Sequence, residues 1–305
     1  MKEIKRGIYP TMITPYNADG SVDYGAVDAI VDWYIQNGVD GIFAVCQSSE
    51  MFYLDEQERA NIARRVVDRA HGRVSVVASG HVSYDAEAQA RELKRIRDSG
   101  VDAVVLVSNR LAAQHEDDDV LIKRLDVLAA KLDGVPLGMY ECPHPYKRLL
   151  SMRVLEHMAC SGRFAFIKDT CCDAQLIRQR VAQLGQRVAL YNANSATLLD
   201  SLRAGCAGFS GIMANFHPAL YGYLYKNWRT QDARIETLSA FLSLASGIER
   251  GLYPMSAKYH MNCVGVHMNL DCRSQPASSF TPLLKREVDD LITLERVAMC
   301  DCGLL

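Results

Sequence analysis

The chain has 305 residues, of which 49% are hydrophobic and 23% are charged, and its formal net charge is -2. This is the composition of an ordinary globular protein, and it offers no basic surface for nucleic acid, which is therefore not an expected partner. No stretch approaches the roughly 18 apolar residues of a membrane span, and no apolar signal region follows the charges of residues 1–6. We therefore expect a cytoplasmic protein with no membrane partner.

Short apolar runs alternate with amphipathic segments over the first two thirds of the chain. The runs predict eight strands, at residues 7–13, 41–45, 74–78, 103–107, 135–140, 164–167, 187–191 and 207–212. Between them, helical periodicity is clearest at residues 24–36, 55–70 and 84–97, and glycines follow these helices at Gly38, Gly72 and Gly100. Eight such units predict an α/β fold, a (β/α)8 TIM barrel with its site at the C-terminal ends of the strands.

After Pro218 the pattern becomes helical only, most clearly at residues 235–244, 255–264 and 284–299. We predict a barrel over residues 1–222 and a C-terminal α-helical extension over residues 223–305, packed on the barrel. No segment rich in glycine, serine or proline separates the two parts.

The cysteines and histidines give no metal pattern. The ten cysteines include no CxxC pair, and the eight histidines form no HxxxH or HxH motif. Cys171 and Cys172 are adjacent, and Cys300 and Cys302 flank Asp301. We expect free thiols, most of them buried, and no metal site.

Lys168 follows the apolar run 164–167, where a buried strand should end. Desolvation there would favour the neutral, nucleophilic amine that forms Schiff bases, although a lysine at a strand end can also extend into water. Tyr140 ends the predicted fifth strand and could transfer protons, or could be a rim aromatic. Ser48, in the polar turn after the second strand, could hold a carboxylate or belong to an ordinary loop. Together these groups suit a 2-oxo acid.

Over nearly its whole length the chain resembles the dihydrodipicolinate synthase and N-acetylneuraminate lyase family, class I aldolases with a Schiff-base lysine in a (β/α)8 barrel. Tyr140 and Lys168 lie 28 positions apart, as in that family, which is the strongest single match. The other matching positions are residues 7–15, Asp23, residues 38–41, Glu50, Leu54, Glu58, Arg59, Leu202, Gly205, Gly208, Ala214, Asn215, Pro254 and Lys258.

The resemblance implies a role for each matching site residue. Lys168 would attack the 2-oxo group and Tyr140 would relay the proton. Gln47 and Ser48 would bind the substrate, Ser48 at its carboxylate. Thr170 would also contact the substrate, and Ser210 would place its backbone carbonyl near the amine. No cofactor is implied, because the imine itself serves as the electron sink. A homotetramer, a dimer of dimers, is the implied assembly.

Departures from the family are equally informative. Gln47 stands where a threonine or serine links the tyrosine to a relay, and Cys46 and Ser49 replace both loop glycines. Residues 108–111 lack the tyrosine that the synthase branch has there. Pro145 stands where the synthase branch has the arginine that binds its aldehyde substrate. Residues 193–196 lack the acidic residues that the sialic-acid lyase branch has after the seventh strand. Both best-known activities are therefore disfavoured.

We predict a class I lyase, an aldolase or dehydratase that forms a lysine Schiff base with pyruvate or a sugar-derived 2-oxo acid. One alternative is dihydrodipicolinate synthase with an altered proton relay, and a second is a barrel that binds a 2-oxo acid without turnover. Arg110 or Arg148 could replace the missing positive charge, and Asn109 or Arg110 could act across a subunit interface. A polar or acidic distal end of the substrate is then expected, with weaker binding in Arg110→Ala.

Overall fold

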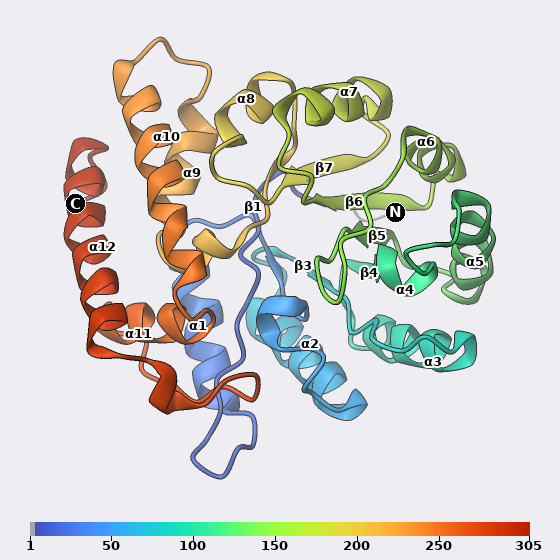
Figure 1. The fold of residues 1–305 in the computed structure, drawn as a ribbon, viewed down its shortest axis with the longest axis horizontal. Coiled ribbons are helices and arrows are strands. Elements are labelled where there is room, and N and C mark those ends of the chain that lie inside the picture. The colour runs from blue at the N-terminus through green and yellow to red at the C-terminus, as the bar shows by residue number, and fades with distance from the viewer. Residues whose placement is uncertain (1–3) are drawn as a thin grey trace.

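The computed structural model of the protein describes residues 4–305, so residues 1–3 of the N-terminal segment considered above lie outside it. An eight-stranded parallel sheet, in the order β1-β8-β7-β6-β5-β4-β3-β2, curls into a barrel (Figure 1). The barrel closes between β1 and β2, where Met12 N donates to Phe43 O at 3.0 Å and Phe43 N donates to Pro10 O at 2.9 Å. The predicted (β/α)8 barrel is confirmed.

All eight predicted strands are present, and all except β4 differ from the prediction at one or both ends. They are β1 (Gly7–Ile8), β2 (Gly41–Phe43), β3 (Ser75–Ala78), β4 (Ala103–Val107), β5 (Leu137–Tyr140), β6 (Phe164–Asp169), β7 (Ala189–Asn192) and β8 (Gly208–Phe209). β1 is shorter than predicted because Pro10 has no N–H to donate. β6 is longer, since Asp169 still pairs with Asn192 of β7.

Helices cover the outside of the barrel. They are α1 (Tyr24–Gln36), α2 (Glu56–Ala70), α3 (Ala86–Arg97), α4 (Ser108–Leu111), α5 (Asp118–Lys131), α6 (Met152–Ser161), α7 (Ala174–Leu184), α8 (Leu198–Arg203) and α9 (Pro218–Asn227). Aspartates begin several of them; the Asp55 carboxylate, for example, accepts from Glu58 N at 2.7 Å. The glycines expected after three helices have positive φ, as at Gly38 (75°) and Gly100 (88°). None of the helices within residues 4–305 is long and apolar enough to cross a membrane.

The predicted late helices are also present and lie together along one side of the barrel (Figure 1). They are α10 (Ala233–Ala245), α11 (Met255–Cys263) and α12 (Pro282–Asp301). The predicted boundary at residue 222 falls within α9, and the division into two domains stays a prediction.

The loop between α11 and α12 is fastened to the C-terminal end of the barrel. The Arg273 guanidinium binds both carboxylate oxygens of Glu58, at 2.6 and 2.7 Å. Next to it, Ser274 N donates to a carboxylate oxygen of Glu50 at 2.7 Å. Asn269 Nδ2 donates to Tyr16 O at 3.2 Å. These contacts hold the extension over the strand ends, where the candidate site lies.

Candidate active site

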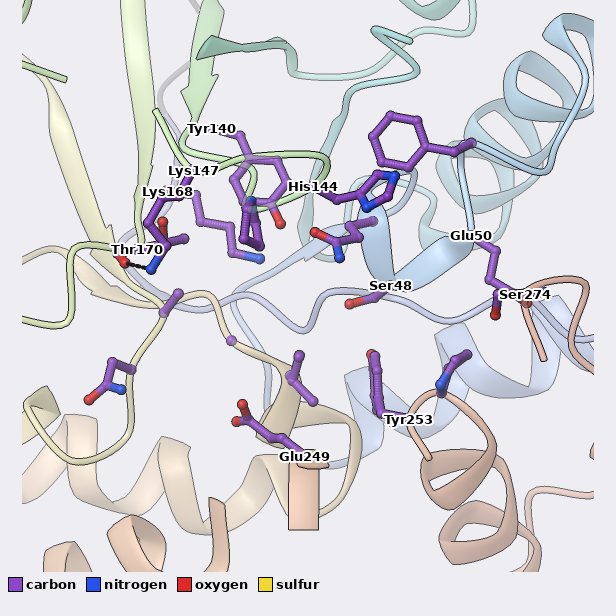
Figure 2. A pocket seen from close by; sticks show the side chains of 18 of the residues that line it. Ser48, Glu50, Tyr140, His144, Lys147, Lys168, Thr170, Glu249, Tyr253 and Ser274 are labelled. Carbon is purple, nitrogen blue, oxygen red and sulfur yellow. Dashed lines mark hydrogen bonds between the residues drawn. The ribbon is translucent and has the colours of Figure 1, made fainter. Parts of the chain in front are cut away.

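The C-terminal ends of the strands surround a cavity of about 360 Å³ (Figure 2). Its barrel side is lined by Gln47, Ser48, Glu50, Phe52, Tyr53, Tyr140, Pro143, His144, Lys147, Lys168, Thr170, Cys172, Ala193, Asn194, Gly211 and Ile212. Its other side comes from the extension, through Glu249, Tyr253, Pro254, Ser274 and Gln275. The extension therefore does more than pack on the barrel, because it completes the wall of the cavity.

Lys168 and Tyr140 project into this cavity side by side (Figure 2). They occupy paired positions of the neighbouring strands β6 and β5. Because side chains alternate along a strand, Lys168 points to the inside of the barrel, as Phe166 does two residues earlier. Lys168 Nζ lies 4.4 Å from the centre of the Tyr140 ring and 5.7 Å from that of Phe43. The structure thus brings together the two residues that the sequence indicates as catalytic.

Burial sets the protonation of both groups. It lowers the pKa of the Lys168 amine, because the ammonium form loses its hydration among aromatic rings, and the nearby thiols of Cys46 and Cys142 oppose this only in part. Burial also raises the pKa of the Tyr140 phenol well above its ordinary value. At neutral pH more of the amine is neutral than in water, and the phenol keeps its proton. This is the pairing of nucleophile and proton donor that imine formation requires.

A thiol lies between Tyr140 and the loop after β2. Cys142 Sγ lies within hydrogen-bonding distance of two acceptors, Gln47 Oε1 at 3.3 Å and His144 O at 3.6 Å. The same thiol contributes to the raised pKa of the Tyr140 phenol. Cys142 is therefore placed between Tyr140 and Gln47, where the sequence leaves the proton relay open. Sequence reasoning missed it because a cysteine two residues after a strand end is usually a small buried hydrophobe.

Three hydroxyl groups adjoin one another beside the amine. Ser48 Oγ donates to Thr11 Oγ1 at 3.0 Å, and the Tyr253 hydroxyl donates to the backbone oxygen of the same residue, Thr11 O, at 3.5 Å. Asn215 Nδ2 holds the Tyr253 hydroxyl at 3.1 Å. Burial raises the pKa of Tyr253 well above 10, so its hydroxyl stays a donor. Ser48 is placed as predicted, whereas Tyr253 comes from the extension, where no local pattern indicated it.

Thr170 and Ser210 are held by backbone contacts. Thr170 lines the cavity, but its hydroxyl donates to Glu141 O at 2.7 Å. Ser210 is fully buried at the end of β8, and its N–H donates to Asn192 O at 2.8 Å. Gly211 and Ile212, the next two residues, line the cavity in its place. The roles given to Thr170 and Ser210 stay predictions.

The residues suggested as substitutes for the missing arginine do not line the cavity. The Arg110 guanidinium lies between the rings of Phe52 and Tyr84, 4.8 and 4.4 Å from their centres. Asn109 is fully buried, and its amide binds three backbone carbonyls, including Cys142 O at 2.8 Å. Arg148 Nη1 donates to Ala113 O and Glu116 O at 2.7 and 2.8 Å. Arg110 and Arg148 therefore do not contribute to the wall of this cavity, and the polar or acidic distal end expected of the substrate stays a prediction.

Other charged groups line the cavity instead, and sequence reasoning did not find them. Lys147, next to the arginine that was considered, donates from Nζ to Thr170 O at 2.8 Å (Figure 2). Glu50 has a left-handed backbone, with φ of 57°, and one of its oxygens accepts from Ser274 N. Glu249 lies in the turn Ser246–Arg250, and no contact of its side chain with the barrel could be foreseen from spacing. The cavity thus carries charges of both signs.

A buried ion cluster is formed by the residues that directly follow Tyr140 and Lys168. Glu141 follows Tyr140 and Asp169 follows Lys168, and both carboxylates contact Arg180 of α7, which lies 2.9 Å from Glu141 Oε1. All three side chains are buried. Burial raises the pKa of Glu141, the charge of Asp169 raises it further, and Arg180 opposes both. Glu141 also accepts from Leu150 N at 2.7 Å and Thr170 N at 2.9 Å, so the cluster fixes the ends of β5 and β6.

Across residues 4–305, no group of three or more His, Cys, Asp or Glu side chains could hold a metal ion. The functional groups gathered at the strand ends are an amine, phenols, hydroxyls, a thiol and carboxylates.

Comparison with known proteins decides the family. The model of the dihydrodipicolinate synthetase family matches residues 5–294. The chain belongs to this family. The predicted enzyme class, a lyase of the dihydrodipicolinate synthase family, is thereby confirmed.

A relative named 4-hydroxy-tetrahydrodipicolinate synthase, from Saccharophagus degradans, is 26% identical over 282 residues, covering 84% of this chain and 95% of the relative. Another of that name, from Acidiphilium cryptum, is 24% identical over 301 residues, covering 98% and 99%.

Solved structures of this family have the same fold. Dihydrodipicolinate synthase DapA-2 from Bacillus anthracis superposes with a TM-score of 0.87 at 18% identity, covering 96% of this chain and 99% of its own. YagE, a prophage protein of the dihydrodipicolinic acid synthase family from E. coli K12, was solved in complex with pyruvate. It superposes with a TM-score of 0.86 at 22% identity, covering 95% and 98%. At these identities the likeness concerns the fold.

Proposed function

We propose that this family member is a class I lyase that forms a Schiff base between Lys168 and pyruvate or a sugar-derived 2-oxo acid. The observation that carries the proposal is the desolvated Lys168 amine beside the Tyr140 phenol in one cavity. Support also comes from the family, one of whose members was solved with pyruvate.

Each part of the site has a chemical role in this proposal. The neutral Lys168 amine adds to the C2 carbonyl, and Tyr140 transfers the proton that lets the oxygen leave as water, which gives an iminium ion. Ser48 and Tyr253 offer hydroxyl donors to the C1 carboxylate. Loss of a C3 proton or cleavage of the C3–C4 bond then gives the enamine, in which the electron pair of the broken bond forms the C2=C3 double bond and the iminium nitrogen takes up the former C=N pair.

Borohydride trapping of the imine tests whether Lys168 forms a Schiff base. After incubation with pyruvate and borohydride, we expect the intact mass to increase by one reduced pyruvate per chain, with the modification on the peptide that contains Lys168. The reason is that reduction converts the imine to a stable secondary amine. A protein that stays unmodified with pyruvate and with larger 2-oxo acids would contradict the proposal and favour a barrel without this chemistry.

Cys142→Val tests the thiol placed between Tyr140 and Gln47. Valine keeps most of the volume and removes the thiol, so the maximal rate of adduct formation should fall about threefold to tenfold, as expected for one neutral hydrogen bond. Half-saturation by pyruvate should not change. Cys206→Val, at a buried thiol that donates to Leu190 O far from the cavity, is the matched control. Equal rates in both variants would show that Cys142 takes no part in proton transfer.

A second candidate is 4-hydroxy-tetrahydrodipicolinate synthase with an altered relay, because the relatives at 24% and 26% identity carry that name. Pro145, in place of the arginine expected from the resemblance, disfavours it. A coupled assay with pyruvate and aspartate semialdehyde separates the two. The homotetramer stays a prediction, to be checked by light scattering of the purified protein.

A further inference from the structure

Glu249 is a carboxylate of the extension that faces Lys168 across the cavity (Figure 2). It lies in the turn Ser246–Arg250, which joins α10 to α11, and the two groups are close enough to influence each other's charge. The sequence places them 81 positions apart. The folded chain therefore sets a second ionisable group opposite the Schiff-base lysine.

The Glu249 carboxylate has no hydrogen-bond partner and no ion-pair partner within residues 4–305. The other charged groups of the cavity wall differ in this respect. Lys147 is bound to Thr170 O, and one oxygen of Glu50 is bound to Ser274 N. A half-buried carboxylate that lines a cavity and lacks protein donors keeps its oxygens available to accept hydrogen bonds from a ligand.

The protonation of Glu249 fits such a role. Burial raises its pKa to about 7, and the positive charge of Lys168 limits that rise. Around neutral pH both forms are present, and the charged form becomes more favourable when a cationic imine is formed nearby. A carboxylate here accepts hydrogen bonds and repels a second carboxylate of a substrate.

We propose that Glu249 determines specificity by accepting a hydrogen bond from a hydroxyl group beyond C2 of the substrate, so that the enzyme selects hydroxylated 2-oxo acids over dicarboxylic ones. This inference rests on the proposed Schiff-base function. It narrows the polar or acidic distal end expected from the sequence to a hydroxylated one, because Glu249 carries a negative charge at this part of the wall when it is ionised.

Borohydride trapping on Lys168 with three probes tests the inference: pyruvate, a six-carbon 3-deoxy-2-oxo sugar acid, and 2-oxoglutarate. The wild-type protein should be modified at lower concentrations of the sugar acid than of 2-oxoglutarate. In Glu249→Leu, half-saturation by the sugar acid should rise at least about tenfold, since a hydrogen bond to a charged group is lost, while half-saturation by pyruvate stays within about twofold. Glu287→Leu, which removes an exposed carboxylate of α12, is the matched control.

Glu249→Gln separates hydrogen bonding from titration, because the amide oxygen still accepts a hydrogen bond but the side chain cannot ionise. The part of the pH dependence of sugar-acid trapping around pH 7 that pyruvate trapping does not share should disappear in this variant, while part of the affinity is retained. Equal losses for pyruvate and the sugar acid, or no loss for either, would overturn the role of Glu249 while leaving the Schiff base intact. Absence of any adduct in the wild-type protein would instead refute the proposed function on which the inference rests.

Discussion

Lys168→Met is expected to abolish trapping by borohydride and also the exchange of the pyruvate methyl protons in deuterium oxide, a reaction that requires the enamine. Methionine has a similar length and fits the aromatic surroundings of Phe43 and Tyr140, so the cavity should keep its shape. The same change should raise the free energy of unfolding by about 0.5–2 kcal/mol, because it removes an amine that folding desolvates.

The stability gain should depend on pH. The pKa of Lys168 is lower in the folded protein than its ordinary value of 10.5. Between these two values the unfolded chain binds more protons, so the stability of the wild-type protein rises with pH in this range. The advantage of methionine is therefore full below the lowered pKa and disappears as the pH approaches 10.5.

Urea unfolding at neutral and alkaline pH, together with the exchange assay, measures both effects. Lys147→Met is the matched control, because this lysine is also at the cavity wall but is bound to a backbone carbonyl. Residual exchange in Lys168→Met comparable to wild type would show that another group activates pyruvate. A loss of stability instead of a gain would show that the amine is better solvated than its surroundings indicate.

The meeting of Lys168 and Tyr140 in one cavity could be predicted from the sequence because their positions follow from local patterns. Lys168 and Tyr140 each end an apolar run, and the ends of parallel strands meet at the same edge of a barrel. The same reasoning gave all eight strands and placed Ser48 at the cavity. The missed ends of β1 and β6 depend on pairing between strands, which the sequence of a single strand does not contain.

The wall opposite the lysine could not be predicted in this way. Glu249 and Tyr253 lie in the segment between α10 and α11, long after the barrel strands. Their position at the cavity depends on how the extension is attached to the barrel, for example by the ion pair of Arg273 with Glu58. No periodicity indicates which side of the extension faces the cavity. For a related reason the sequence does not show that the Arg110 guanidinium lies between the rings of Phe52 and Tyr84 and not at the cavity wall.

Arg180→Met is expected to destabilise the protein by about 3–5 kcal/mol, since it leaves two buried carboxylates without their cation. Arg180 contacts Glu141 and Asp169 and also donates to Leu150 O at 2.7 Å, and all of these groups are buried. The loss should exceed that of any exposed pair, such as Arg286 with Asp290 on α12, whose removal as Arg286→Met is the control.

The pH dependence of this loss identifies its cause. The pKa of Glu141 is already raised above 4.5 in the folded protein, so the native state binds more protons than the unfolded chain and stability falls as the pH rises through this range. Without Arg180 the pKa of the Glu141 carboxyl rises further, so Arg180→Met should be more destabilised at pH 8 than at pH 5.

Adding Glu141→Gln to Arg180→Met should restore part of the stability, because one of the two repelling charges is gone. If the double variant is no more stable than Arg180→Met at pH 8, the cost is lost packing of the arginine and not charge. Because Glu141 and Asp169 adjoin Tyr140 and Lys168, the ion cluster then links the stability of the strand ends to the placement of the catalytic pair.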